Sequence, residues 1–364
     1  MRLGFVVPRY ESEATGETQE RARDLGSRLF ARGHRVEVLT ATSSDLPAAT
    51  AVSESQGVSV RHFPATASRE GWPVVPGIVG HLVRHRHRYD ALVFFSCPSW
   101  AMAHGLKVDP RRSVLVPAHT RPDALEPRGV APLLEAKATV AFDTPEEQAL
   151  VERAAPGAGL TGETVGRGLD LAGESGPRET PGRLKGQGDY FLLTGPLEAQ
   201  DGYAVTAERF LRAQRECRVP LTLVLVGRGR IVLSENVHVR QLGALSEAEE
   251  REVLGGALAV LVPARREALA PSALHAWGRG RPVIAHGRSE VMRRLVTRTS
   301  GGVACGNDEE LAAALEVLAA EPALADALGQ SGLDYVAAHH AWPVVLEKWE
   351  RLLGRVAGGG GVAA

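Results

Sequence analysis

A chain of 364 residues is long enough for about two domains, and 44% hydrophobic with 23% charged residues is the composition of an ordinary globular protein. This composition excludes fibrous, disordered and membrane-spanning classes. The 42 basic and 43 acidic residues leave a formal net charge of -1, so no overall charge bias indicates a nucleic acid partner.

The three cysteines, Cys97, Cys217 and Cys305, are far apart in the sequence. Their spacing excludes a zinc ribbon and a dense disulfide framework, and it favours a reducing, cytosolic setting. The apolar run Leu3–Val7 is too short for a signal-peptide core or a membrane span. We expect it to belong to a first β-strand.

Short apolar runs bounded by turn residues alternate with longer amphipathic stretches, which is the pattern of parallel sheets covered by helices. The strands expected in the first half are Arg2–Val7, Arg35–Leu39, Val58–Phe63, Asp90–Phe95, Ser113–Pro117 and Ala138–Phe142. Those expected in the second half are Tyr190–Thr194, Leu221–Val226, Val237–Gln241, Ala257–Val262 and Pro282–Ala285. Helices are expected to start with a capping side chain and a Glu three residues later at 144–147, 246–249 and 307–310.

The pattern predicts an α/β protein with two Rossmann-like domains that face each other across a cleft. Residues 171–187 are rich in Gly, Pro, Glu and Arg and mark an interdomain linker. In open α/β sheets, phosphates bind where helix N-termini meet the carboxyl ends of the strands. The cleft therefore favours a nucleotide or nucleotide-sugar ligand.

Local patterns give only weak candidates for the site. Gly16, in a small polar loop after the first strand, allows a ligand to approach the backbone, or it is a simple strand-to-helix turn. His119 follows a buried strand and is able to bond a sugar hydroxyl or phosphate, although the local pattern taken alone favours a structural role. His81 and His85 share one helix face, where a metal site competes with the alternative of a solvated basic face.

The stretch from Val262 to Ala285 is the most informative part of the sequence. A strand is expected to end here, followed by a turn that contains a Glu. A helix is then expected to start near Pro271, and a Gly-containing break leads from it to another strand. This arrangement resembles the C-terminal domain of the large retaining glycosyltransferase family with the GT-B fold, the group 1 or family 4 enzymes with an E-x7-E motif. Further matches are the R-G-H-x-V of residues 32–36, the V-G-x-G of 226–229, the L-G-x-v-s of 242–246 and Ala341-Trp342 at the start of a final helix.

The resemblance implies a division into an acceptor-side domain (1–170), the linker (171–187), a donor domain (188–340), a helix that crosses back to the first domain (341–357) and a flexible tail (358–364). It also implies roles for individual residues. Glu267 and His119 are the expected catalytic residues, with Glu267 on the donor-sugar hydroxyls and His119 on the sugar or its phosphate. The expected donor-binding residues are Gly16, Gly195, Gly227, Arg228, Arg265, Arg266, Ala268, Leu269 and His275.

The sequence departs from the family at the residues that bind the donor. The second Glu of E-x7-E is His275, whose neutral imidazole accepts fewer hydrogen bonds from a ribose than a carboxylate does. The Arg and Lys that hold the diphosphate in relatives are replaced by Pro196 and Asp201. Losing one preorganised donor of this kind costs about 3–4 kcal/mol of transition-state stabilisation. Compensation would fall to Arg228, Arg265 and Arg266, unless these three only keep the surface soluble.

The expected function is transfer of a sugar from a nucleotide-diphosphate sugar to an acceptor hydroxyl with retention, without a metal or a further cofactor. The acceptor is a glycan, a lipid-linked molecule or a small molecule. Two alternatives stay open: a catalytically silent homologue that binds or scaffolds an active glycosyltransferase partner, and a transferase for an unusual donor. We expect a cytoplasmic protein, and the basic residues 84–88 leave peripheral contact with the inner face of a membrane open.

Overall fold

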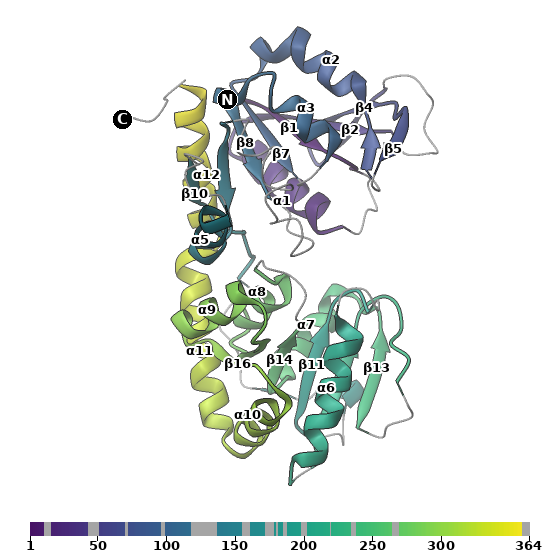
Figure 1. The fold of residues 1–364 in the computed structure, drawn as a ribbon, viewed down its shortest axis with the longest axis vertical. Helices are drawn as coiled ribbons and strands as arrows, with labels where there is room; N and C mark the ends of the chain where they lie inside the picture. Colours follow the sequence, from purple (N-terminus) through teal and green to yellow (C-terminus); the bar gives the residue numbers. More distant parts are fainter. Residues whose placement is uncertain are drawn as a thin grey trace. The chain divides into compact units, whose positions relative to one another are not determined.

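The computed structural model describes residues 1–10, 16–42, 51–69, 72–95, 99–117, 137–154, 161–171, 178–179, 181–184, 188–197, 202–218, 220–233, 238–263 and 269–358. The chain divides into two compact units (Figure 1). Unit 1 contains Met1–Gly168 and Pro343–Ala364, and unit 2 contains Leu169–Trp342. Unit 1 is therefore built from two separate parts of the sequence.

Unit 1 is organised around an eight-stranded sheet in the order β10-β9-β8-β7-β1-β2-β4-β3. Its strands are β1 (Arg2–Val7), β2 (Arg35–Ala41), β3 (Ala51–Ser55), β4 (Val58–Phe63), β7 (Ala91–Phe95), β8 (Ser113–Val116), β9 (Thr139–Phe142) and β10 (Gly162–Thr164). All neighbouring pairs are parallel except β3 with β4. Strands β1 and β7 are buried along almost their whole length, as expected for the centre of a parallel sheet.

The helices of unit 1 are α1 (Glu17–Ala31), α2 (Pro76–His85), α3 (Trp100–Gly105), α5 (Pro145–Ala154) and α12 (Trp342–Ala357), with single 3-10 turns η1 (Arg86–Arg88) and η2 (Pro110–Arg112). A separate two-stranded hairpin pairs β5 (Ala67–Arg69) with β6 (Trp72–Val74).

Helix α1 shows why the R-G-H sequence follows it. Gly33 adopts φ +88, its N–H bonds the carbonyl of Phe30 at 2.9 Å, and the His34 N–H reaches back to Leu29 at 3.1 Å. This is a Schellman motif, in which a left-handed residue satisfies the last carbonyls of a helix. The motif turns the chain directly into β2.

Helix α12 completes unit 1 from the far end of the sequence, and Figure 1 shows it beside β10 and α5. It buries one face, which includes Trp349. Its Glu350 accepts bonds from His34 Nε2 and Arg32 Nη2, both at 3.0 Å, and Arg355 pairs with Glu163 of β10.

Unit 2 contains a six-stranded, fully parallel sheet in the order β13-β12-β11-β14-β15-β16. Its strands are β11 (Tyr190–Thr194), β12 (Thr222–Val226), β13 (Val239–Gly243), β14 (Ala259–Val262), β15 (Val283–His286) and β16 (Gly302–Cys305). Its helices are α6 (Tyr203–Glu216), α7 (Glu247–Gly256), α8 (Pro271–Trp277), α9 (Glu290–Thr299), α10 (Asp308–Ala320) and α11 (Pro322–His339), with the 3-10 turn η4 (Gly182–Leu184). The order reverses direction between β11 and β14, which is where open α/β sheets bind ligands.

The three expected helix starts are present. The Glu three residues after the capping side chain accepts from a different backbone N–H at α7 and at α5. At α7, the Ser246 side chain and Glu249 form a reciprocal capping box. At α5, Glu147 instead accepts from the N–H of Asp143, one residue before the capping Thr144.

The expectation of two parallel α/β sheets is confirmed. Within the described residues, the structure adds five short strands that the sequence pattern did not indicate: β3, β5, β6, β10 and β16. Each has five residues or fewer, and none forms a long apolar run. Their strand conformation depends on pairing with a neighbour rather than on local sequence.

Candidate functional site

Three glycines end three adjacent strands at the carboxyl edge of the unit 2 sheet. Gly195 follows β11 with φ +141, Gly227 follows β12 with φ +139, and Gly243 ends β13 with φ +72. The N–H of Gly195 bonds the carbonyl of Val226 at 3.0 Å, and the N–H of Gly227 bonds that of Gly243 at 2.9 Å. We call this row the glycine edge.

The glycine edge has no room for side chains at its two inner positions. A Cβ on Gly227 would lie 1.7 Å from the carbonyl oxygen of Gly195, and one on Gly195 would lie 1.9 Å from the hydroxyl of Tyr203. A Cβ on Gly243 would meet nothing within 4 Å. Open space therefore lies beside the half-buried backbone at the end of β13, whereas the backbone is tightly packed at the ends of β11 and β12.

The loops that leave the glycine edge are tied to each other. The N–H of Leu197 bonds the carbonyl of Arg228 at 2.7 Å, and Leu197 forms an isolated parallel bridge with Gly229. Both Pro196 and Arg228 are exposed. The turn after β12, which carries Arg228, thus lies next to the turn after β11, which carries Pro196.

A carboxylate also lies at this edge. The Thr194 hydroxyl at the end of β11 donates to Glu250 Oε1 of α7 at 2.8 Å. Nothing in the local sequence indicates Glu250, because it follows the capping box of α7 as one of several acidic residues. The contact joins residues 56 positions apart and depends on the sheet.

The structure places only some of the expected donor residues. Leu269 is buried at 2% exposure just before α8, and His275 is exposed on α8. His119, Glu267, Arg265, Arg266 and Ala268 lie outside the described residues. Their expected roles stay predictions.

At the carboxyl edge of the unit 1 sheet, Gly16 is the N-cap of α1, and its carbonyl accepts from the N–H groups of Gln19 and Glu20. Its φ of -139 suits any residue, and a Cβ would meet nothing closer than 3.8 Å. Neither the backbone nor the packing within unit 1 requires a glycine here.

Ion pairs surround this helix start, and the sequence pattern did not reveal them. Arg167 Nη1 donates to Glu17 Oε1 at 2.6 Å, and Arg21 forms a bidentate pair with Asp143, in which Nη1 to Oδ2 is 3.0 Å. Burial disfavours the charge of Arg167, but Glu17 and Asp143 outweigh it and raise the pKa of this guanidinium. The pairs fix α1 to the ends of β9 and β10.

The histidine pair on α2 is not a uniformly solvated face. His81 is buried, and its Nε2 lies 3.0 Å from the hydroxyl of Tyr89, which donates to Glu37 at 2.6 Å. Burial lowers the pKa of His81 to about 4. No group of three or more histidine, cysteine or acidic residues suited to a metal occurs in the described part of the chain.

The basic residues after α2 line a surface hollow of about 390 Å³. Its lining residues are Arg86, His87, Asp109, Arg111 and Arg112. Among the helices that the structure describes, none is long and apolar enough to cross a membrane.

Residues 188–321 match the family model described as glycosyl transferases group 1. Among solved structures, sucrose-phosphate synthase from Thermosynechococcus elongatus is 18% identical with a TM-score of 0.69, over 98% of this chain and 99% of that one. Anabaena HepE in complex with UDP and glucose is 16% identical with a TM-score of 0.68, over 97% and 99%. WaaG, a glycosyltransferase involved in lipopolysaccharide biosynthesis, is 16% identical with a TM-score of 0.62, over 98% and 100%. No curated protein sequence matches this chain.

Proposed function

We propose that this chain transfers a sugar from a nucleoside-diphosphate sugar to an acceptor hydroxyl with retention at the anomeric carbon, because residues 188–321 match the group 1 glycosyltransferase model and the chain has the GT-B fold. Retention is the stereochemistry that the E-x7-E resemblance implies. The acceptor belongs to the class of glycans, lipid-linked molecules or small molecules.

The observation that carries this proposal is the glycine edge. Three neighbouring strands end in glycines with positive φ, so the carboxyl end of this part of the sheet carries no side chain at these three positions. The open space beside Gly243 suits a flat group such as a nucleoside. HepE, which shares this fold, was solved with UDP and glucose.

In this proposal, Glu267 holds the donor sugar and His119 orients the sugar or its phosphate. Gly16 lies below the acceptor or phosphate, at the N-terminus of α1. The helix N-termini and arginines of unit 2 stabilise the departing diphosphate, so neither a metal nor a cofactor beyond the nucleotide sugar takes part.

Arg228 is the compensating cation that the structure supports best. Its backbone carbonyl is bonded to Leu197, next to Pro196, and its side chain is exposed. We expect Arg228→Ala to weaken nucleoside-diphosphate binding at least fivefold. Arg230→Ala, two residues further along the same exposed turn, is the matched control and should leave the affinity within twofold.

A thermal-shift screen with purine and pyrimidine nucleoside-diphosphate sugars tests the proposal. A ligand that binds only the folded state at about 100 times its Kd stabilises it by roughly 2.7 kcal/mol, which a melting curve resolves. The wild type should shift with at least one donor. The double variant Pro196→Arg, Asp201→Lys should shift more, because it restores two charge-assisted contacts.

The same screen separates the enzyme from the silent homologue. A shift in the reverted variant alone favours a silent scaffold for an active glycosyltransferase, and no shift in either protein refutes the assigned donor site. With a donor identified, release of the nucleoside diphosphate in the presence of acceptor measures turnover.

We also propose a cytoplasmic location, which the free thiols of Cys217 and Cys305 support. Peripheral contact with an anionic membrane would use the basic residues 84–88 beside the hollow of unit 1. Sedimentation with phosphatidylglycerol vesicles, compared with neutral phosphatidylcholine vesicles, tests this contact.

A further inference from the structure

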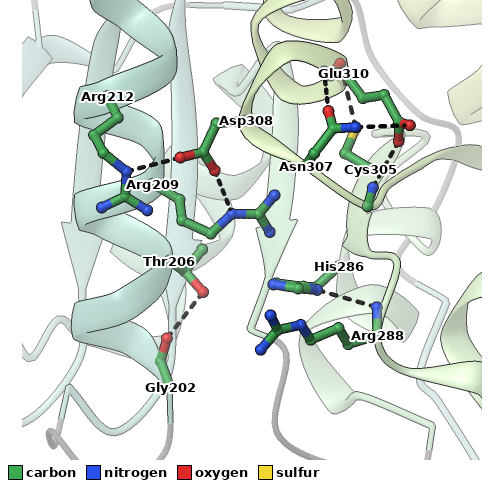
Figure 2. A network of polar contacts seen from close by, with 11 residues as sticks. Gly202, Thr206, Arg209, Arg212, His286, Arg288, Cys305, Asn307, Asp308 and Glu310 are labelled. Carbon is green, nitrogen blue, oxygen red and sulfur yellow. Dashed lines mark hydrogen bonds and ion pairs between the residues drawn. The ribbon is translucent and has the colours of Figure 1, made fainter.

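A cluster of basic side chains lies at the carboxyl end of β15 in unit 2, away from the glycine edge. Arg209 belongs to α6, His286 ends β15, and Arg288 follows two residues later. Figure 2 shows the imidazole of His286 between the guanidinium groups of Arg209 and Arg288, with all three side chains directed toward the same space beside α6.

Arg209 is held in place on one side only. Its Nε donates to Asp308 Oδ1 at 2.8 Å, and Arg212 Nε donates to Asp308 Oδ2 at 2.7 Å. Arg209 is 8% exposed, and its Nη2 is buried without a hydrogen-bond partner among the described residues. A buried charged donor without a partner is costly, because it has lost its hydrogen bonds to water without replacing them. The free side of the guanidinium is therefore poised to donate to an acceptor.

His286 adds a second oriented donor. Its Nδ1 accepts the backbone N–H of Arg288 at 3.1 Å, so the ring proton of the neutral imidazole resides on Nε2. Burial, assisted by the positive charges of Arg209 and Arg288 and opposed by Asp308, lowers the pKa of His286 to about 4. At neutral pH the ring is a neutral donor through Nε2.

The charges around this space do not balance among the described residues. Asp308 already accepts from both Arg209 and Arg212, and Figure 2 shows Arg288 on the other side of His286 from this carboxylate. The nearby carboxylate of Glu310 is occupied at the start of α10, where it accepts from the Gly306 N–H at 2.7 Å and the Asn307 side chain at 3.2 Å. The free guanidinium and imidazole donors thus lack an anion.

We propose that Arg209, His286 and Arg288 form a binding site for a phosphate-like oxyanion. Several donors that converge from different directions match the many acceptor positions of a phosphoryl group, and arginine forks match pairs of its oxygens. The site lies at the carboxyl edge of a parallel sheet, where such groups bind in this type of fold. The inference concerns a ligand group and not a reaction, so it holds whether or not the chain transfers a sugar.

Isothermal titration calorimetry of the full chain with inorganic phosphate tests the site. Arg288→Gln removes an exposed side chain, and Arg209→Gln removes the buried one. Each should weaken phosphate binding at least tenfold. Arg212→Gln is the matched control, because Arg212 bonds the same Asp308 but its guanidinium points away from His286 in Figure 2. The affinity of this control for phosphate should stay within about twofold of the wild-type affinity.

A second titration with UDP identifies the source of the phosphoryl group. If the two variants lose affinity for phosphate and UDP alike, the site holds the donor diphosphate; if only phosphate binding is lost, it holds a separate phosphorylated ligand. Both results support the site. Circular dichroism shows whether each variant is folded. If Arg209→Gln is unfolded, the phosphate affinity of Arg288→Gln alone tests the proposal. Absence of phosphate binding at tens of millimolar in the wild type, or equal losses in Arg212→Gln and Arg288→Gln, overturns the proposal.

Discussion

Replacing Gly227 by alanine should break the glycine edge at its tightest point. The new Cβ would lie 1.7 Å from the carbonyl oxygen of Gly195, far inside the 3.0 Å that Cβ atoms essentially never cross. The residue would also have to keep φ +139, which L side chains rarely adopt. Backbone strain of about 1–3 kcal/mol and overpacking of a similar size add to an expected loss of about 3–5 kcal/mol in the free energy of unfolding of unit 2.

Substitutions at two other glycines separate the effect of the steric overlap from the effect of the positive φ. Gly243→Ala keeps a positive φ of +72 but meets nothing within 4 Å, so it should cost only about 1–2 kcal/mol for the left-handed conformation. Gly354→Ala, in the interior of α12 with open space around it, should stabilise unit 1 by about 0.5–1 kcal/mol. All three variants add one methyl group, but they differ in whether that group meets neighbouring atoms and in whether the backbone φ is positive.

Urea unfolding followed by circular dichroism gives the free energies, and hydrogen exchange read by mass spectrometry shows which unit opens. Exchange should accelerate in peptides of β11 and β12 in Gly227→Ala, and unit 1 should be unaffected. A Gly227→Ala protein within about 1 kcal/mol of Gly243→Ala would refute the reasoning, because the clash would then be absorbed at no cost.

The remaining predictions concern catalysis and pH. Glu267→Ala should lower kcat, measured as nucleoside-diphosphate release, at least about a hundredfold and leave the melting temperature nearly unchanged. Unfolding of the variant would instead indicate a structural role. Burial lowers the pKa of His81 to about 4 from the ordinary 6.5. Between these two pH values the imidazole binds a proton in the unfolded chain but not in the folded one. The contribution of His81 to stability is therefore fully present above pH 6.5 and is lost as the pH falls toward 4. Melting temperatures across this range should fall less in His81→Gln than in the wild type, and equal slopes would contradict the assignment.

The sequence predicted the buried parallel strands best. The bounds of β1, β4 and β11 agree with the expected ranges, since each is an apolar run bounded by turn residues. The edge strand β16 was missed because Gly302 begins it and its four residues pair with β15 alone. Local pattern identifies a strand that the core surrounds, whereas an edge strand is defined by its one neighbour.

Site residues whose role depends on distant partners could not be predicted. Arg209 and Arg212 have the same charge on the same helix and both bond Asp308, yet only the folded structure shows that the first side chain is 10% exposed and the second 51%. His81 stands among arginines in the sequence, yet Tyr89 and Glu37 enclose it. Gly195 and Gly227 were expected at the site, and each directly follows an apolar run, so their turns are visible in the sequence itself; Gly243 ends the mixed strand VRQLG and entered only as part of the L-G-x-v-s match.

The return of α12 to unit 1 has a consequence for the order in which the protein folds during synthesis. Residues 1–168 leave the ribosome well before the helix that carries Trp349, and all of unit 2 is made in between. Unit 2 is continuous in sequence and is able to fold as soon as it emerges, while the earlier segment waits with an apolar face uncovered. The N-terminal half of this chain is thus the last to mature, and it is the part that a chaperone would need to shield while synthesis continues.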